Sequence, residues 1–299
     1  GEIIDKTKKV TFEFGAIVSP KETQGQILFE TKVEGLESQW QQTSAQKRTI
    51  EFPAGSKEYT FLVRAKINSV IDQTPAKRTF KVNLSLYLGK VKISSVSNSV
   101  VTLTSYLNQE EKINITNWKI KGKRGEFTIP QGSTLYIPAS FPSNEDIFIK
   151  KSDTVYFWAS SSPFGINRVF RPNKCFGYLK TPVQSISSQK ICPRINREEI
   201  CYFSDRCQSL ILGLERCTSV DYSKDPQISW DDNCKSYINN YIAENLNYDG
   251  CVENYYKDKD FFQNTWYIYP GFNIFCKCSD ILYLYDKNGL LVDKYYYKS

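Results

Sequence analysis

The stretch INITNWKIKGKRGEFTIPQGS, residues 113–133, contains the clearest fold signal in this chain. Apolar residues alternate with polar ones along it, and Trp118 stands near its start. Such alternation is typical of β-strands that bury one face. Pro130 and Gly132 indicate a turn at its end. The stretch therefore predicts short strands joined by turns, with no helical segment between them.

Strand patterns of the same kind flank this stretch on both sides. Between residues 9 and 85, short alternating runs are separated by turn signals such as Pro53-Ala54-Gly55. After a long interruption the pattern resumes at 281–297, ILYLYDKNGLLVDKYYY, where Asp286-Lys287-Asn288-Gly289 predicts a hairpin. This organisation predicts a mainly β fold, with two tandem antiparallel β-sandwiches of the immunoglobulin or fibronectin type III kind.

The interruption at 176–275 has helical spacing and is rich in cysteine. SDRCQSLILGLERC (204–217) begins with a serine cap, and SWDDNCKSYINNYIAENLN (229–247) spaces its apolar residues at intervals of three and four. Dense cysteines are typical of oxidising compartments outside the cytoplasm. We expect a disulfide-rich α-helical insertion in the second sandwich. The cysteines are Cys175, Cys192, Cys201, Cys207, Cys217, Cys234, Cys251, Cys276 and Cys278.

The spacing of these cysteines favours particular disulfides. Two helices with a cysteine near each end suggest an antiparallel hairpin, in which the outer cysteines meet and the inner ones meet. Cys201 then has Cys276 or Cys278 as its candidate partner. One cysteine remains, either free and buried or linked to another chain. The favoured pairs are Cys207–Cys251, Cys217–Cys234 and Cys175–Cys192.

We expect no metal, no cofactor and no enzymatic activity. The chain has no histidine, and its closest cysteine pair, in Cys276-Lys277-Cys278, has a gap of one residue that is uncommon in zinc sites. The lack of histidine also excludes Ser-His-Asp and Cys-His catalysis. No phosphate loop, GxSxG or dinucleotide motif is present.

Three short motifs in the first 88 residues carry a family resemblance. They are Glu34-Gly35-Leu36 followed by Trp40, Pro53-Ala54-Gly55 before Tyr59-Thr60-Phe61, and Val63-Arg64-Ala65. With these motifs the region resembles the fibronectin-type-III-like module called the triple-tyrosine domain. The resemblance implies a spacer or accessory sandwich over residues 1–88, and we expect Trp40 to be its large core residue.

The second half is similar to another family. The motifs are ITNWKI (115–120), FTIP (127–130) with Gly132 after it, and YLYDKNGLLVDKYYY (283–297). In this order they resemble the lamin-tail domain, an immunoglobulin-like sandwich, in bacterial surface proteins that carry a Cys-rich insertion. The resemblance implies a sandwich built from residues 89–175 and 276–299, with Trp118 between its sheets.

Charge and hydropathy limit the classes of binding partner that we expect. The net charge is +7, and the densest basic cluster is WKIKGKRGEF, residues 118–127. Nucleic-acid binding usually needs a basic stripe on a known module, and none is recognised here. We interpret these lysines as a solvated strand face, with attraction to an acidic surface polymer as the alternative. No apolar run is long enough to cross a bilayer. The chain has no methionine, so we expect an exported chain whose signal peptide has been removed.

Two groups of aromatic and apolar residues are candidates for an interface. Residues 1–9 are a polar leader before an alternating run, and together they are a candidate exchange strand that adds to a neighbour's sheet edge. The terminal tyrosines are candidates for stacking on sugar rings or for a protein interface. The candidate residues are Val10, Phe12, Phe14, Tyr295, Tyr296 and Tyr297.

These features predict a non-enzymatic extracellular or cell-surface protein with a structural or adhesion role. One form of that role is a repeating subunit of a surface filament or layer, assembled by strand addition. A carbohydrate-binding module of an exported protein is the alternative, and the accessory part of an exported enzyme is a third. The expected partners are further copies of the chain, another surface protein, or a glycan; nucleic acid is not expected.

Overall fold

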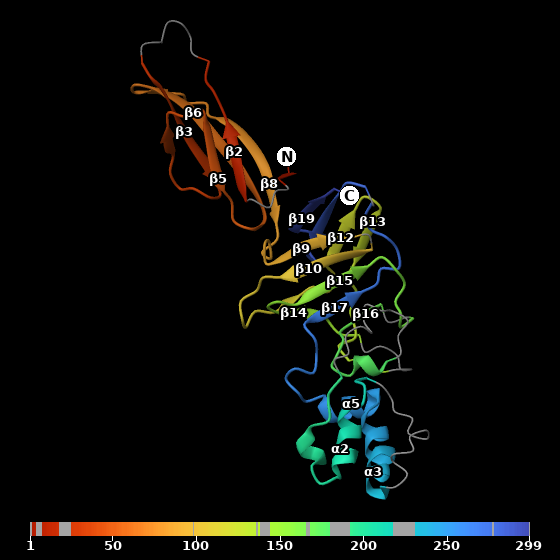
Figure 1. The fold of residues 1–299 in the computed structure, drawn as a ribbon. Coiled ribbons are helices and arrows are strands. Elements are labelled where there is room, and N and C mark those ends of the chain that lie inside the picture. The colour runs from red at the N-terminus through yellow and green to blue at the C-terminus, as the bar shows by residue number, and fades with distance from the viewer. Residues whose placement is uncertain are drawn as a thin grey trace.

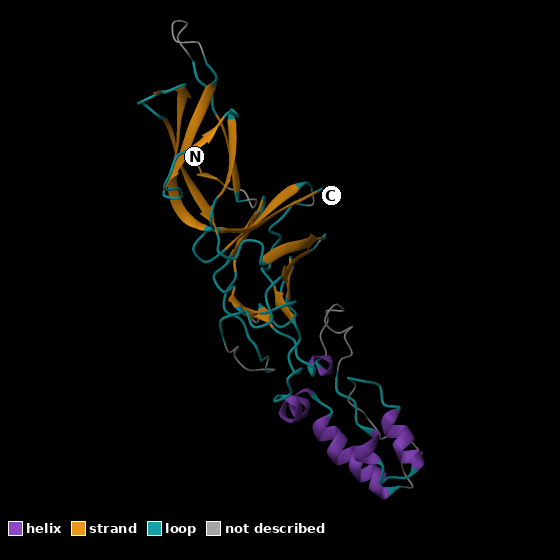
Figure 2. Cartoon of the chain, turned by 90° about the vertical axis from the view of Figure 1, so that its left-hand side faces the viewer, coloured by secondary structure: helices purple, strands orange, loops and turns teal. Residues whose placement is uncertain are grey.

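The computed structural model describes two groups of β-strands, with helices at the far end of the second group (Figures 1 and 2). The architecture confirms a mainly β fold of the sandwich type with a helical insertion. The residues described are 2–3, 8–17, 25–97, 99–135, 137, 144–165, 168–179, 192–217, 231–276 and 278–298.

The first domain packs a larger sheet against a two-stranded one. The larger sheet has the order β4 (Gln41–Thr43), β3 (Ile27–Glu34), β6 (Gly55–Ile67), β8 (Ala76–Leu84), with β7 (Val70–Ile71) beside β6 and β1 (Glu2–Ile3) parallel to β8. The smaller sheet pairs β2 (Lys9–Glu13) with β5 (Lys47–Glu51). The turn at Pro53-Ala54-Gly55 leads into β6, as expected.

Aromatic side chains fill the space between these two sheets. The ring of Phe12 stacks on that of Phe61 with centroids 4.0 Å apart. The expectation that Trp40 belongs to this core is wrong. Trp40 is only partly buried, and the guanidinium of Arg64 lies 4.2 Å from its ring centroid. Arg64 and its ion-pair partner Glu30 stand on the outer face of the sheet, so Trp40 covers that face instead.

The second domain is also a sandwich. One sheet has the order β13 (Gly125–Thr128), β12 (Lys119–Gly122), β18 (Asp280–Tyr285), β19 (Leu291–Tyr297). The other has the order β16 (Val169–Phe170), β17 (Thr265–Ile268), β15 (Thr154–Trp158), β10 (Val100–Ser105), β9 (Val91–Val96). A short pair, β11 (Ile113–Asn114) with β14 (Phe148–Ile149), completes it. Trp118 is fully buried in the core, as the lamin-tail resemblance implied.

Two details of this sandwich differ from the sequence prediction. β17 lies inside the expected insertion, 176–275, yet it belongs to the sandwich and runs parallel to β15. Its residues TWYI are almost wholly buried, which is typical of a strand covered on both faces, and such a run lacks the alternation that marks strands elsewhere. The sandwich is therefore not purely antiparallel, and the helical part of the insertion ends before Thr265.

The two domains are joined by direct hydrogen bonds. Leu84, the last residue of β8, pairs with Leu291, the first residue of β19. The next residue, Ser85, donates its backbone N–H to the carbonyl of Leu291 at 2.9 Å, and its hydroxyl to Asp286 Oδ2 at 2.6 Å. Ser85 and Asp286 are buried, so this junction extends one sheet into the other.

The insertion consists of short helices around a small core of its own. Ser204 caps α2 and Asp231 caps α3, each through the N–H of the cysteine three residues later. The helix at 204–217 was predicted, and the second segment is helical from Asp232 to Asn245 with a π-helical stretch. The elements are η1 (Phe176–Tyr178), η2 (Arg197–Ile200), α2 (Asp205–Leu212), α3 (Asp232–Ser236), η3 (Tyr237–Ile242), α4 (Ala243–Asn245) and α5 (Tyr248–Tyr255).

The observed disulfides differ from all three favoured pairs. Cys207–Cys251, Cys217–Cys234 and Cys175–Cys192 are not formed. In their place the structure contains Cys175–Cys251, Cys192–Cys217, Cys207–Cys234 and Cys276–Cys278. Cys201 is the free cysteine among the described residues, and it is exposed rather than buried.

The packing of the helices explains why the favoured disulfides are not formed. Cys207 and Cys234 lie in the first turns of α2 and α3, with Cα atoms 5.8 Å apart. The two cap residues are hydrogen bonded as well, since the Ser204 hydroxyl donates to Asp231 Oδ2 at 3.0 Å. The N-terminal ends of the two helices therefore meet, whereas the antiparallel hairpin assumed from the sequence would separate them.

Non-reducing peptide mapping tests this arrangement. We expect linked peptides for Cys175–Cys251 and Cys207–Cys234, because these cysteines are buried and within bonding distance. Alkylation before reduction should label Cys201, since its side chain is exposed. A peptide containing Cys207 linked to Cys251 would restore the antiparallel hairpin and contradict the structure.

Candidate functional site

The outer side of the sheet formed by β13, β12, β18 and β19 gathers the most distinctive side chains. Along β18 the residues alternate strictly, with Leu282 and Leu284 fully buried. Ile281, Tyr283 and Tyr285 therefore point away from the core of the second domain and are partly exposed, and the two tyrosines also pack against the core of the first domain. The sheet presents three large apolar side chains in a line along one strand.

Neighbouring strands place lysines beside these rings. In the pairing of β12 with β18, Lys121 lies opposite Tyr283 and Lys119 opposite Tyr285. The rings of Tyr283 and Tyr285 have centroids 6.0 Å apart and an interplanar angle of 14°. On the other side of β18, Tyr296 lies opposite Ile281. We call the surface formed by Lys119, Lys121, Ile281, Tyr283, Tyr285 and Tyr296 the tyrosine–lysine face.

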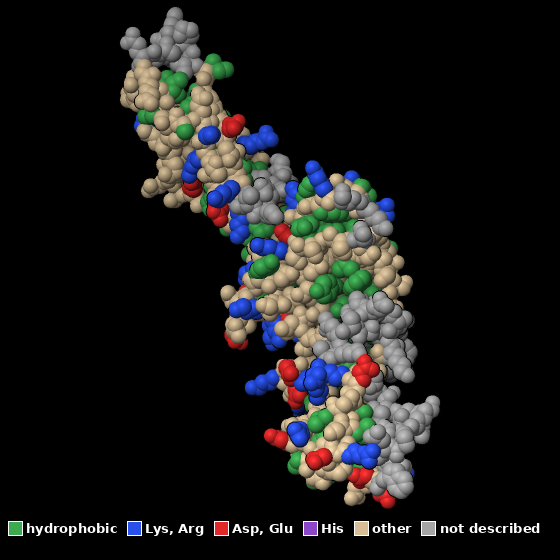
Figure 3. All heavy atoms as spheres, in the orientation of Figure 1, with side chains coloured by type: hydrophobic (Ala, Val, Ile, Leu, Met, Phe, Trp, Pro, Cys, Tyr) green, Lys and Arg blue, Asp and Glu red, His purple; other side chains and the backbone are tan. Residues whose placement is uncertain are grey.

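Two hollows make this face a groove. The first, of about 470 Å³, is lined in part by Lys121, Lys123, Tyr283 and Tyr296. The second, of about 390 Å³, is lined in part by Lys119, Lys121 and Tyr285. Lys121 lines both, so the two hollows meet at this side chain. In the space-filling view, Lys and Arg side chains border hydrophobic ones over the region of β12 and β19 (Figure 3).

Most carboxylates next to the groove are buried under it. Asp280 is 5 % exposed, and its Oδ2 accepts hydrogen bonds from the N–H groups of Lys123 and Cys276. Asp286 is 4 % exposed and accepts from the N–H groups of the hairpin turn. Backbone donors compensate these charges inside the domain. The charges left on the surface of the groove are therefore mainly positive.

Glu126 on β13 is the acidic side chain that does reach the surface. It lies 2.8 Å from the Nζ of Lys119. The hydrogen bond from Lys119 holds the pKa of the Glu126 carboxyl below its ordinary value. This pair is exposed to solvent, so its contribution to stability is small. Glu126 also lies opposite Lys121 in the pairing of β12 with β13, so it offsets part of the charge of both lysines.

The predicted terminal tyrosines divide between core and surface. Tyr296 is 56 % exposed and belongs to the tyrosine–lysine face. Tyr295 and Tyr297 pack against the core of the second domain, and the Tyr297 hydroxyl donates to the carbonyl of Cys276. Sequence reasoning did not single out Tyr283 and Tyr285. Their two-residue spacing in a strand next to a hairpin was the available signal.

The other predicted interface residues lie in the first domain. Val10, Phe12 and Phe14 pack against the core of their own domain. Phe14 contacts Phe29 edge-on, with ring centroids 5.1 Å apart. Tyr283 and Tyr285 of the tyrosine–lysine face pack against the same core cluster. Self-association through the N-terminal strand stays a prediction.

One cluster has the residue types of a metal site. Ligand atoms of Cys207, Asp231 and Cys234 lie within 4.8 Å of one another. The two cysteines form a disulfide, so they offer no thiolate. Asp231 Oδ1 accepts the N–H of Cys234, at 2.9 Å, and caps α3. These contacts assign the cluster to the structure of the insertion.

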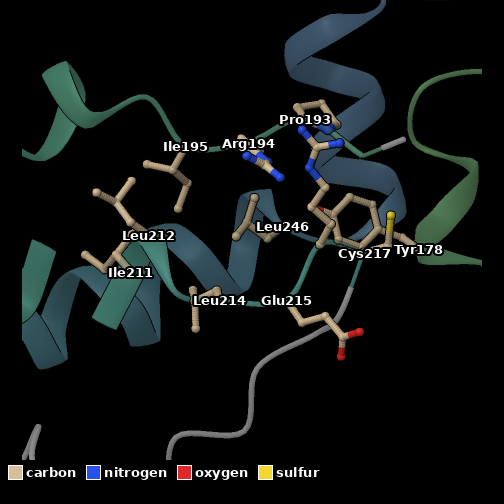
Figure 4. Close-up of a pocket in the computed structure, with 11 residues that line it drawn as sticks. Tyr178, Pro193, Arg194, Ile195, Ile211, Leu212, Leu214, Glu215, Cys217 and Leu246 are labelled. Atoms are coloured by element: carbon tan, nitrogen blue, oxygen red, sulfur yellow. The ribbon is translucent and has the colours of Figure 1, made fainter. Parts of the chain in front are cut away.

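A further hollow lies in the insertion, beside the Cys192–Cys217 disulfide. Its volume is about 490 Å³. Figure 4 shows Pro193 and Arg194 on one side of it and Leu214 and Glu215 on the other. Ile211, Leu214 and Leu246 line it, and these residues belong to the small core of the insertion. We assign this hollow to the packing between loops and helices.

Comparison with known proteins gives distant matches. No family model matches the chain, and no curated protein does. Among solved structures, the FN1–FN3 domains of chicken CNTN1 are 10% identical with a TM-score of 0.20, covering 49% of this chain and 51% of that one. Chitinase ChiA74 from Bacillus thuringiensis is 16% identical with a TM-score of 0.16, covering 43% and 21%. The chain spans about half of the first and a fifth of the second. At these TM-scores neither match carries an argument about function.

Unfolding in urea tests the assignment of Tyr296 to the surface and of Tyr297 to the core. We expect Tyr296→Ser to change the free energy of unfolding by less than about 0.5 kcal/mol, because the ring is mostly exposed. Tyr297→Ser should lower it by about 2 kcal/mol, since it removes a ring packed on Phe275 and a hydrogen bond. Equal losses from the two variants would show that Tyr296 serves the core and is not available to a ligand.

Proposed function

We propose that this chain is a non-enzymatic extracellular adhesion protein that binds carbohydrate through the tyrosine–lysine face. The observation that carries the proposal is the nearly parallel pair of partly exposed rings, Tyr283 and Tyr285, each lining a hollow and each with a lysine opposite it. Aromatic rings bind apolar faces of ligands and leave their polar edges accessible. Lysine ammonium groups donate hydrogen bonds to hydroxyl and carboxylate oxygens. A sugar ring offers both kinds of surface.

Disulfides support an extracellular location. Four are formed among the described residues, and three of them hold an insertion whose small core contains few large side chains. In the part of the chain that the structure describes, no helix is long and apolar enough to cross a membrane. The resemblance of the second half to lamin-tail domains of bacterial surface proteins favours the same location.

The links from the first domain and from the insertion to the second sandwich fit a role in holding the groove in place. The hydroxyl of Ser85 and the carboxylate of Asp286 join the first sandwich to the hairpin of β18 and β19. At the other end, Cys175–Cys251 joins the edge of the sandwich to α5. Both connections are buried. The first domain and the insertion therefore flank the sandwich that contains the groove.

Polysaccharide binding tests the proposal. In affinity electrophoresis against a panel of soluble polysaccharides, we expect at least one to retard the protein. Tyr283→Ala and Tyr285→Ala should each weaken that binding about tenfold, because each removes a stacking surface. Tyr106→Ala is the matched control, since Tyr106 is 57 % exposed and has Lys92 Nζ 4.9 Å from its ring centroid, outside the groove. Loss of binding in all three variants alike would contradict the assignment of the groove.

Strand addition between copies is a second candidate function, and one observation favours it. Among the described residues, β2 pairs with β5 on one side and has no strand on its other side. β1 pairs with β8 through two residues only, so it is easily exchanged for the same strand of another copy. Light scattering of the chain with and without residues 1–9 tests this. We expect oligomers that the deletion removes; a monomer in both cases would exclude it.

A further inference from the structure

We infer that the ligand of the tyrosine–lysine face is a polysaccharide that carries carboxylates, a polyuronate. This inference rests on the proposed function and specifies its ligand class. Two features carry it: lysines in a row along one strand, and tyrosine rings in a parallel row on the next. The juxtaposition of Lys121 with Tyr283 and of Lys119 with Tyr285 places a cation beside each ring.

The spacing of the lysines suits a polymer with regularly repeated charges. Lys119 and Lys121 alternate with the buried Ile120, so both reach the same face of β12. Residues two apart along a strand are separated by roughly 6.6 Å. Lys123 follows the end of β12 in the turn before β13, where its Nζ donates a hydrogen bond to the carbonyl of Ser279 at 3.3 Å. A chain lying along the strands meets a cation at each of these steps.

The charge of the groove is only partly cancelled from within. Glu126 forms its ion pair with Lys119 and lies opposite Lys121 in the pairing of β12 with β13, so one exposed carboxylate faces two lysines and a positive charge remains. The carboxylates of Asp280 and Asp286 lie under the surface and accept backbone hydrogen bonds. An anionic ligand supplies the missing counter-charge.

The rings select a sugar over other polyanions. A polyol phosphate or an acidic peptide segment supplies negative charge but no pyranose ring to stack on Tyr283 and Tyr285. A neutral glycan supplies the ring but no charge for the lysines. A uronate supplies both in one repeating unit, with a carboxylate attached to the ring that the tyrosines stack against. The chemistry of the groove therefore favours a polyuronate.

Isothermal titration calorimetry with polygalacturonate and its fully methyl-esterified form tests the inference. The ester keeps the sugar rings and loses the charge. We expect polygalacturonate to bind at least about tenfold more tightly than the ester at about 20 mM salt, and this difference to shrink at about 500 mM salt. Lys121→Gln should weaken binding of polygalacturonate about fivefold and leave binding of the ester unchanged. Lys92→Gln, beside Tyr106 outside the groove, is the matched control and should change neither.

The outcomes separate this inference from the proposed function. If the ester binds as tightly as polygalacturonate, and Lys121→Gln has no effect, the carboxylate assignment is wrong and carbohydrate binding stands. If polyglutamate or poly(glycerol phosphate) binds as tightly as polygalacturonate, the groove recognises charge without a sugar ring, and the inference is wrong. If no polysaccharide binds and the tyrosine variants change nothing, both the inference and the proposed function fail.

Discussion

The pairing register of β12 with β18 is the constraint on which the groove depends. On the buried face this register sets Ile120 opposite Leu284, and on the exposed face it sets Lys121 opposite Tyr283. Because side chains alternate along a strand, a slip of one residue would turn Ile120 outward and bring a lysine into the core. Packing around the fully buried Trp118 therefore fixes the positions of the lysines and the rings. The arrangement of the exposed side chains therefore follows from the packing of the core.

The same hairpin serves the fold and the candidate site. Asp286 closes the turn between β18 and β19 and accepts the hydroxyl of Ser85 from the first domain. Asp293 on β19 accepts the N–H of Ile93 on the opposite sheet, at 2.8 Å. These carboxylates are used inside the protein, and their burial removes negative charge from the surface above them. The positive groove is thus a consequence of how the sandwich satisfies its buried polar groups.

The sequence predicted what local periodicity determines. Alternation predicted both sandwiches, the turn residues predicted the hairpin at 286–289, and helical spacing after a serine cap predicted the helix at 204–217. Prediction from local sequence patterns failed where the structure depends on tertiary contacts. Trp40 covers Arg64 on an outer face, and β17 joins a sheet from within the insertion. The disulfides follow from which helix ends meet, which spacing alone does not determine. Likewise, only the sheet order brings the lysines of 118–127 next to Tyr283 and Tyr285, which lie far away in sequence.

The central claim is that one face of the second sandwich is the ligand surface. Hydrogen exchange measured by mass spectrometry, with and without a galacturonate oligosaccharide, tests it most directly. We expect slower exchange in peptides covering 119–123 and 281–285, with the first domain and the helical insertion unchanged. Protection confined to the insertion or to the first domain, with these two strands unaffected, would contradict it.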